Sequence, residues 1–421
     1  MNLDFEAMDK SDELSSFRSR FHIPLGGDKK PVHYFCGNSL GLQPIEAHDA
    51  ILQEMNDWKR LGVEGHFHAK RPWFSYHTFF PELLAPLVGA LPIEIVAMNS
   101  LTVNLHLMLT SFYRPTELRH KIILAGKDFP SDRYAIESQI RLHGYDPEQA
   151  MVEIQPVPGA HVLTTEQIEK AITEHADSVA LVMFSGVHFL TGQFFDLARI
   201  AKAAHDVGAH VGFDLAHAIG NVEMRLHDWN ADFAVWCSYK YLNSGPGGVG
   251  GVFVHERHAE RNDLPRLAGW WGNNEATRFE IERGFQSMRG ASGWQLSNAQ
   301  ILPMAVHKTA LDVFADATMK RISAKRDTLT AMAEHLIDDA LKNTDEVRII
   351  TPRDPRQRGA QLSIGFDKKG REVFDGLIAD GMIVDWRSSN VIRVAPAPLY
   401  TSYADVAAFG DSFSKQIKKH L

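Results

Sequence analysis

Short apolar segments alternate with amphipathic segments through the middle of this chain. The apolar segments have the length of buried strands, and glycine or polar residues follow most of them; they cover residues 121–124, 152–157, 178–184, 210–213 and 233–236. The segments between them place apolar residues at helical spacing, and Thr164 with Gln167 forms a capping box at the start of one. Because strands alternate with helices, we predict a mostly parallel sheet with helices on both faces.

The pattern changes near residue 299, where one long helix is predicted to run to residue 342. The segments after it predict a small α+β unit, with strands at 347–350, 361–366, 383–386 and 391–395 and helices at 371–380 and 403–418. A chain of 421 residues exceeds the usual size of a single core. We therefore expect an N-terminal segment and helix (1–70), a large domain (71–305) and a small C-terminal α+β domain (306–421).

Chemically useful side chains recur just after the predicted strands. Ligands of such sheets bind beyond the carboxyl ends of the strands, so these side chains are expected to meet at one edge: Phe129, Asp132, Ser185, Asp214, His217, Tyr239 and Lys240. Core packing does not explain four separate polar clusters at the same edge. The pattern therefore predicts a binding or catalytic site there.

Lys240 indicates the chemistry of that site. It follows the apolar run at 233–236 and precedes a loop with five glycines, where a ligand could lie against thin backbone. A lysine removed from water is a good imine-forming amine, which favours a Schiff base with pyridoxal phosphate (PLP). An ordinary surface lysine before a glycine turn is the alternative. The loop itself matches neither a P-loop nor a dinucleotide fingerprint, because a strand rather than a helix follows it.

The sequence offers a candidate for each other part of a PLP site. Asp214 is the acid that would keep the ring nitrogen protonated, and Phe129 is the aromatic side chain that would stack on the ring. The predicted helix start at 100–102 can bind phosphate, supplemented by Tyr239. Arg393 lies in an apolar strand, where an unpaired arginine is costly, so it is the candidate for a substrate α-carboxylate. As alternatives, these residues are ordinary turn, cap or core residues.

The composition narrows the possible partners. Lys and Arg total 44 and Asp and Glu total 52, a net charge of −8 without a basic block, which argues against nucleic acid or an anionic membrane as partner. The N-terminus is acidic and lacks an apolar signal region, and no run of about 18 apolar residues occurs. Cys36 and Cys237 have no metal-ligand spacing and cannot form a disulfide framework. We expect a cytoplasmic protein without bound metal.

Stretches distributed almost from end to end of the chain resemble kynureninases, PLP-dependent enzymes of fold type I related to the class V aminotransferases. The matching stretches are YFCGNSLGLQP (34–44), KRPW (70–73), MNSLTVNLHLM (98–108), FPSDRYAIESQ (129–139), FSGVHFLTGQ (184–193), GFDLAHAIGNVE (212–223), DWNADFAVWCSYKYLNSGPGG (228–248), GWWGN (269–273), LSNAQ (296–300) and VIRVAPAPLY (391–400). The resemblance implies an α/β large domain with a mostly parallel seven-stranded sheet flanked by helices, plus a small α+β C-terminal domain.

The resemblance also implies roles for individual residues. Lys240 would carry PLP as a Schiff base and, with Tyr239, would be catalytic. The implied cofactor-binding residues are Leu101, Thr102, Phe129, Asp132, Ser185, Asp214, His217, Tyr239, Lys240, Trp270 and Asn298. Trp270 and Asn298 would come from the neighbouring subunit, since these enzymes resemble each other in being homodimers with shared active sites. The choice of Trp270 over Trp271 rests on the register of the GWxG motif.

The reaction implied by the resemblance is hydrolysis of L-kynurenine, an amino acid, to anthranilate and L-alanine in tryptophan catabolism. The substrate-binding residues would be Arg393, Ser39, His66 and Asn298. His66, Ser297 and Asn298 offer polar partners to a 3-hydroxyl group on the aromatic ring. By analogy with the family, we expect 3-hydroxy-L-kynurenine to be accepted as well, giving 3-hydroxyanthranilate.

Other functions fit parts of the sequence. An aminotransferase can use the same scaffold, and residue types alone do not exclude it. A cysteine desulfurase needs a mobile catalytic cysteine, for which Cys36 and Cys237 are poorly placed. Asp214 and His217 with the loop histidines could form a metallohydrolase site. A nicotinamide dehydrogenase lacks its fingerprint, and a simple binding module does not need so many reactive groups at one edge.

Overall fold

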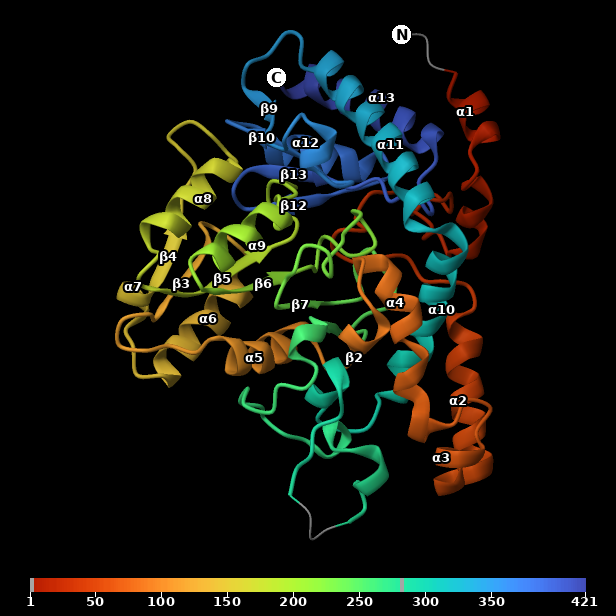
Figure 1. The fold of residues 1–421 in the computed structure, drawn as a ribbon. Coiled ribbons are helices and arrows are strands. Elements are labelled where there is room, and N and C mark those ends of the chain that lie inside the picture. Colours follow the sequence, from red (N-terminus) through yellow and green to blue (C-terminus); the bar gives the residue numbers. More distant parts are fainter. Residues whose placement is uncertain (1–3, 281–283) are drawn as a thin grey trace.

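A seven-stranded sheet forms the centre of the larger part of the molecule (Figure 1). The computed structural model describes residues 4–280 and 284–421. The strand order is β2-β8-β7-β6-β5-β3-β4, with bounds β2 (Ile95–Ala97), β3 (Lys121–Ala125), β4 (Met151–Ile154), β5 (Val179–Ser185), β6 (His210–Asp214), β7 (Phe233–Trp236) and β8 (Gly251–Val254). Strands β3 to β7 are parallel, while β8 runs antiparallel to β7 and β2 antiparallel to β8. The predicted mostly parallel sheet is confirmed.

Helices cover both faces of this sheet, because successive strand residues point to opposite sides. In β3, Ile122 and Leu124 belong to the core beneath α5 and α6, whereas Ile123 and Ala125 belong to the core on the other face. Figure 1 shows α5 and α6 below the sheet and α8 and α9 above it. The flanking helices of the large part are α4 (Pro81–Val88), α5 (Leu101–Phe112), α6 (Pro130–Leu142), α7 (Pro147–Ala150), α8 (Thr165–Glu174) and α9 (Leu197–Asp206).

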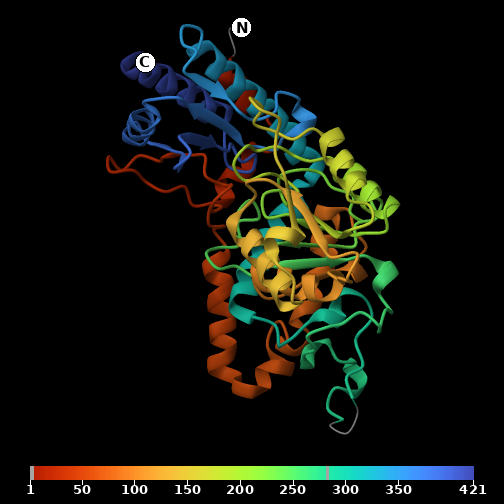
Figure 2. The ribbon, with the colours of Figure 1, turned by 90° about the vertical axis from the view of Figure 1, so that its left-hand side faces the viewer.

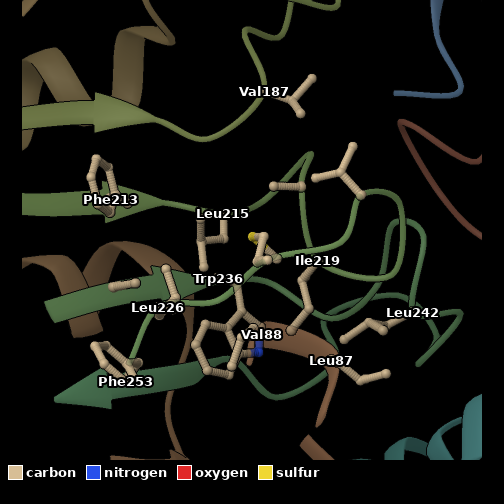
Figure 3. Packing of buried hydrophobic residues seen from close by; sticks show 14 of the residues in the cluster. Leu87, Val88, Val187, Phe213, Leu215, Ile219, Leu226, Trp236, Leu242 and Phe253 are labelled. Carbon is tan, nitrogen blue, oxygen red and sulfur yellow. The ribbon is translucent and has the colours of Figure 1, made fainter. Parts of the chain in front are cut away.

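Part of the glycine-rich segment after Lys240 packs closely against neighbouring side chains. Trp236 is fully buried, and its ring lies among Val88, Leu226 and other apolar side chains (Figure 3). A Cβ at Gly251 would come within 2.3 Å of the Trp236 ring. None of the glycines between 245 and 251 lines the cavity described below. That a ligand lies against this loop stays a prediction, and Gly251 allows the chain to pack closely on the Trp236 ring.

The long helix predicted for 299–342 is interrupted. The structure has α10 (Ile301–Ala317) and α11 (Met319–Ala340), separated at Thr318, whose φ of +61° ends the first helix. The sequence gives no glycine or proline to mark this break. Helix α10 packs against α2 (Ala47–Leu61) and α4, and α11 packs against α13 (Tyr403–His420). The two helices thus connect the large part to the small part (Figures 1 and 2).

The C-terminal part is the predicted α+β unit. Its four-stranded antiparallel sheet has the order β12-β13-β10-β9 and is covered by helices. The elements of this part include β9 (Val347–Ile349), β10 (Leu362–Phe366), α12 (Gly370–Ala379), β11 (Met382–Ile383), β12 (Asp385–Arg387) and β13 (Val391–Val394), of which β11 lies outside the four-stranded sheet. Among the described residues, no helix is both long and apolar enough to cross a membrane.

The N-terminal segment joins both parts. It contains α1 (Phe5–Ser11), β1 (His33–Tyr34), α2 and the short α3 (Gly65–His68). Strand β1 pairs in parallel with β11 of the C-terminal part. A few residues later, the Gly41 N–H donates to the Tyr239 carbonyl at 2.8 Å. The segment therefore reaches from the small sheet to the loop that carries Lys240. The division of the chain at residues 70 and 305 stays a prediction.

Candidate active site

The residues expected at the strand ends meet at one cavity. Ser185 at the end of β5 is in register with Asp214 at the end of β6, and Asp214 is in register with Val235 of β7. The cavity beyond these ends is lined by Leu101, Thr102, Asp128, Phe129, Ser131, Ser185, Val187, Phe189, Asp214, Ala216, His217, Tyr239 and Lys240. The structure thus brings together all of the residues expected at this edge of the sheet except Asp132, which does not line the cavity.

Lys240 faces an aromatic ring across this cavity. Its side chain is half-buried, and its Nζ lies 5.6 Å from the centroid of the Phe129 ring. Phe129 immediately precedes α6, whose start at Pro130 fixes the backbone direction there. The Phe129 side chain remains 38% exposed, so its ring is open to a planar ligand.

Two buried carboxyl groups lie beside the lysine. Burial raises the pKa of Asp214, while a hydrogen bond with Asp132 and the charge of Lys240 oppose the rise. Burial raises the pKa of Asp132 well above its usual range, and the negative charge of Asp214 raises it further. Two carboxylates this close cannot both ionise easily. The pKa of Asp132 is raised further than that of Asp214, so Asp214 is the member of the pair that ionises more readily beside a ligand.

Several buried polar atoms around the cavity lack a hydrogen-bond partner among the described residues. They are Ser185 Oγ, His217 Nδ1 and Asp132 Oδ1. Burial lowers the pKa of His217 well below its usual range, and the charges of Lys240 and Arg393 lower it further, so the imidazole is neutral at pH 7. Unpaired buried polar atoms are costly. A polar ligand at this position would satisfy them.

The start of α5 offers a site for a phosphate group. Ser100 precedes the helix without capping it through its side chain, so the first N–H groups of α5 lack that partner. Thr102 Oγ1 lies 2.9 Å from Ser131 Oγ, which brings two hydroxyls together at the same end of the cavity. Phosphate donors, a lysine, an aromatic ring and a buried acid are the groups that PLP requires. The residues present fit that cofactor.

Five lining residues were not singled out from the sequence: Asp128, Ser131, Val187, Phe189 and Ala216. Asp128 precedes Phe129 in the loop after β3, and Ser131 lies in the first turn of α6, so the strand-end rule could have found them. Phe189 follows Ser185 by four residues, and its ring packs edge-on against Phe129 with a centroid distance of 5.4 Å. Apolar lining residues such as Phe189 carry no chemical signal in the sequence.

Besides Asp132, five predicted site residues do not line the cavity of this chain. Arg393 is fully buried next to it, and donates from Nη1 to the Phe189 carbonyl at 2.6 Å. Ser39 and Asn298 are exposed, and Trp270 is 47% exposed. His66 is half-buried, with its ring 5.7 Å from that of Trp73. Their assignment to cofactor or substrate stays a prediction.

The histidines do not build a metal centre around Asp214. Within residues 4–280 and 284–421, the group of three potential ligands that lie close enough together is Glu94, His227 and His255. It contains neither Asp214 nor His217. Its Glu94 carboxylate already accepts hydrogen bonds from the backbone N–H of Leu91 and of Glu256 at 2.8 Å each. The geometry does not support the metallohydrolase alternative.

The fold and this cavity together define a class, the PLP-dependent enzymes of fold type I. The chain superposes on a cysteine desulfurase from Thermococcus onnurineus NA1 with a TM-score of 0.77 at 18% identity, covering 96% of this chain and 98% of that one. It also superposes on a cysteine desulfurase from Escherichia coli with a TM-score of 0.75 at 18% identity, covering 97% and 99%. At this identity the likeness concerns the fold alone.

Closer relatives identify the family. A kynureninase from Myxococcus xanthus (strain DK1622) is 52% identical over 402 residues, which cover 96% of this chain and 94% of that protein. Kynureninases from Flavobacterium johnsoniae and Nematostella vectensis are 49% and 47% identical, covering 97% and 96% of this chain and 96% and 91% of theirs. Residues 322–413 match the kynureninase C-terminal domain, and residues 76–227 match the DegT/DnrJ/EryC1/StrS aminotransferase family. The chain belongs to the kynureninase family.

The two cysteines differ from what a desulfurase needs. Burial raises the pKa of Cys36 to about 12, and burial raises the pKa of Cys237 to about 11. The thiolate is the reactive form of cysteine, so neither side chain is a nucleophile at neutral pH.

The carboxyl pair predicts a pH-dependent difference between wild type and Asp132→Asn. A raised folded-state pKa means that the unfolded chain loses the Asp132 proton first, so this group destabilises the cofactor-free protein progressively as pH rises from about 4. Replacing the Asp132 carboxyl with an amide removes this loss of stability at high pH. We expect Asp132→Asn to gain stability relative to wild type as pH rises, so the free energy of unfolding of the variant minus that of wild type is larger at pH 8 than at pH 5. Urea unfolding of the two cofactor-free proteins measures it; an equal difference at both pH values contradicts the shared proton.

Proposed function

We propose that this enzyme hydrolyses L-kynurenine to anthranilate and L-alanine, breaking the Cβ–Cγ bond with PLP as cofactor. The observation that carries the proposal is the identity of about half with kynureninases over almost the whole chain, together with a cavity that brings Lys240, Asp214 and Phe129 together. An aminotransferase would use the same lysine and aspartate. The C-terminal match at 322–413 favours the hydrolase.

Lys240 has the position of the residue that binds the cofactor and moves protons. When bound, PLP supplies a carbonyl that condenses with amines and a ring that withdraws electrons from the substrate Cα. Asp214 would hold the proton at the ring nitrogen, and Phe129 would stack on the ring face. Lys240, displaced by the substrate amine, would be free to take the Cα proton. Phe129 and Asp214 would thus hold the cofactor where the Lys240 amine can reach the substrate Cα.

Tyr239 has the properties of a proton donor. Burial raises the pKa of its phenol above the usual range, so the hydroxyl stays protonated at neutral pH. A protonated hydroxyl suits donation to a developing negative charge and does not suit a general base. Water adds to the side-chain ketone of the substrate; its oxygen ends on the aromatic acid, and a proton ends on Cβ of alanine. We assign Tyr239 to the stabilisation of the ketone oxygen during this addition.

Replacing the lysine tests the proposal directly. Lys240→Ala is expected to lower the rate of L-kynurenine hydrolysis by about 10³-fold or more, because both amine exchange and proton transfer lose their group. Anthranilate fluorescence reports the rate. The matched control is Lys202→Ala, an exposed lysine paired with Asp206, which should leave the rate unchanged. Borohydride treatment and peptide mapping of the wild-type holoenzyme should find the cofactor on Lys240; turnover that survives in Lys240→Ala contradicts the assignment.

The second substrate gives a separate prediction. His66, Ser297 and Asn298 are polar, and none of them lines the cavity of its own chain. If they bind a 3-hydroxyl group, they do so from a neighbouring subunit. We expect kcat/KM for 3-hydroxy-L-kynurenine to equal or exceed that for L-kynurenine. Steady-state kinetics with both substrates decide this, and a strong preference for the unsubstituted substrate contradicts it.

We further propose a homodimer with shared active sites. An exposed aromatic patch, formed by Phe67, Phe74, Trp270 and Phe279, supports it: ring centroids within the patch lie 5.4 to 6.2 Å apart, and three of its residues are 47% to 66% exposed. Large exposed apolar patches mark interaction sites. Trp271, by contrast, is fully buried and donates to His77. This burial supports Trp270 as the tryptophan that reaches a second chain.

Mixed dimers test the sharing of sites. Lys240→Ala and the double variant Trp270→Ala/Asn298→Ala should each be nearly inactive alone. When they are co-expressed, random pairing leaves roughly a quarter of all sites with both contributions intact, so activity should return to that fraction of wild type. The control pairs Lys240→Ala with Asp214→Ala, whose defects lie in the same cavity and cannot complement. Equal activity of both mixtures contradicts the shared site.

A further inference from the structure

Arg393 is held by two partners and has donors left over. It lies in β13, and its side chain is completely buried. Nε donates to Asp385 Oδ2 at 2.6 Å, and Nη1 donates to the Phe189 carbonyl at 2.6 Å. Nη2 is buried and has no hydrogen-bond partner among the described residues. A buried donor without a partner is costly, and more so on a charged group. A ligand that accepts a hydrogen bond from Nη2 would remove this cost.

The free edge has the geometry that a carboxylate requires. A guanidinium offers five N–H donors in a fixed plane. Asp385 takes the one on Nε and the Phe189 carbonyl takes one on Nη1, which leaves one N–H of Nη1 and both N–H groups of Nη2. Two parallel donors of this kind bind a carboxylate in bidentate fashion. Because Phe189 lines the cavity, its carbonyl ties the guanidinium to the cavity wall.

Asp385 orients the arginine without cancelling the positive charge of the site. Arg387 Nε lies 3.0 Å from the same Asp385 oxygen that Arg393 contacts. Two guanidinium groups therefore share one carboxylate, and the cluster keeps a net positive charge. That charge reaches the cavity, since both arginines contribute to the lowered pKa of His217. The positive charge that remains after pairing with Asp385 attracts a second anion, which a neutral one-to-one pair would not do.

We propose that Asp385 is a positioning residue for the substrate α-carboxylate: it fixes Nε of Arg393 so that the Nη1–Nη2 edge faces the carboxylate of the bound amino acid. This rests on the proposed function. Fixing the side chain before binding removes the rotamer entropy that a free arginine loses when it binds. Asp385 acts through Arg393 and does not itself touch the substrate.

The test compares two amines that differ only in the carboxylate. L-alanine and ethylamine are titrated into the holoenzyme, and the change in cofactor absorbance gives each dissociation constant. Asp385→Asn should weaken L-alanine binding by roughly 10- to 100-fold, the range for a hydrogen bond to a charged group. Ethylamine binding should not change. KM for L-kynurenine should rise in parallel, with kcat changed far less.

A double-mutant cycle with Arg393→Gln shows whether Asp385 acts through the arginine. In the Arg393→Gln background, Asp385→Asn should have no further effect on L-alanine binding. Asp367→Asn is the matched control, since Asp367 pairs with Arg348 at the surface of the same domain and should leave both amines unaffected. If Asp385→Asn does not fold, Asp385→Glu keeps the charge but moves it by one methylene, and should weaken L-alanine alone.

Equal weakening of L-alanine and ethylamine, additive effects in the cycle, or unchanged L-alanine binding would each overturn the proposal. Failure of the proposed function gives a different result. In that case the wild-type enzyme does not produce anthranilate from L-kynurenine, whatever the two amines show.

Discussion

A buried negative charge organises this molecule. Asp214 sits at the end of a central strand, and a carboxylate removed from water is stable only with a cation or strong donors beside it. The strands on both sides provide that environment: β5 aligns Ser185 with Asp214, and β7 leads to Lys240. Asp132, on the first turn of α6, adds a second carboxyl whose pKa is raised further than that of Asp214. The register of β5 to β7, the start of α6 and the loop that carries Lys240 together place these groups around the Asp214 carboxyl.

The sequence was sufficient where local pattern and a general rule of α/β sheets combine. Ser185, Asp214 and Lys240 each follow an apolar run, and the rule that ligands bind at strand ends placed them together without knowledge of the packing. Features that depend on contacts distant along the chain were not predictable. The pairing of Asp132 with Asp214 belongs to this class, and no glycine or proline in the sequence marks the break at Thr318. Strand β2 is only three residues long, too short for a hydrophobic pattern to appear.

Fold and chemistry separate clearly in this protein. The backbone matches cysteine desulfurases closely at 18% identity, yet both thiols are buried and protonated. In the C-terminal sheet of this chain, Arg393, Asp385 and the Phe189 carbonyl form one connected cluster. Reaction type is thus decided by a few side chains mounted on a shared scaffold.

The placement of the N-terminal segment has a consequence for biosynthesis. Asp9 accepts hydrogen bonds from the N–H groups of Tyr403 and Ala404 at the start of the last helix, and β1 pairs with β11. Domains made first on the ribosome usually fold first. Here Asp9 and β1 reach their final positions only after β11 and the start of α13 have been made. The same segment contacts the Tyr239 carbonyl through the Gly41 N–H, whereas the residues that line the cavity lie between Leu101 and Lys240.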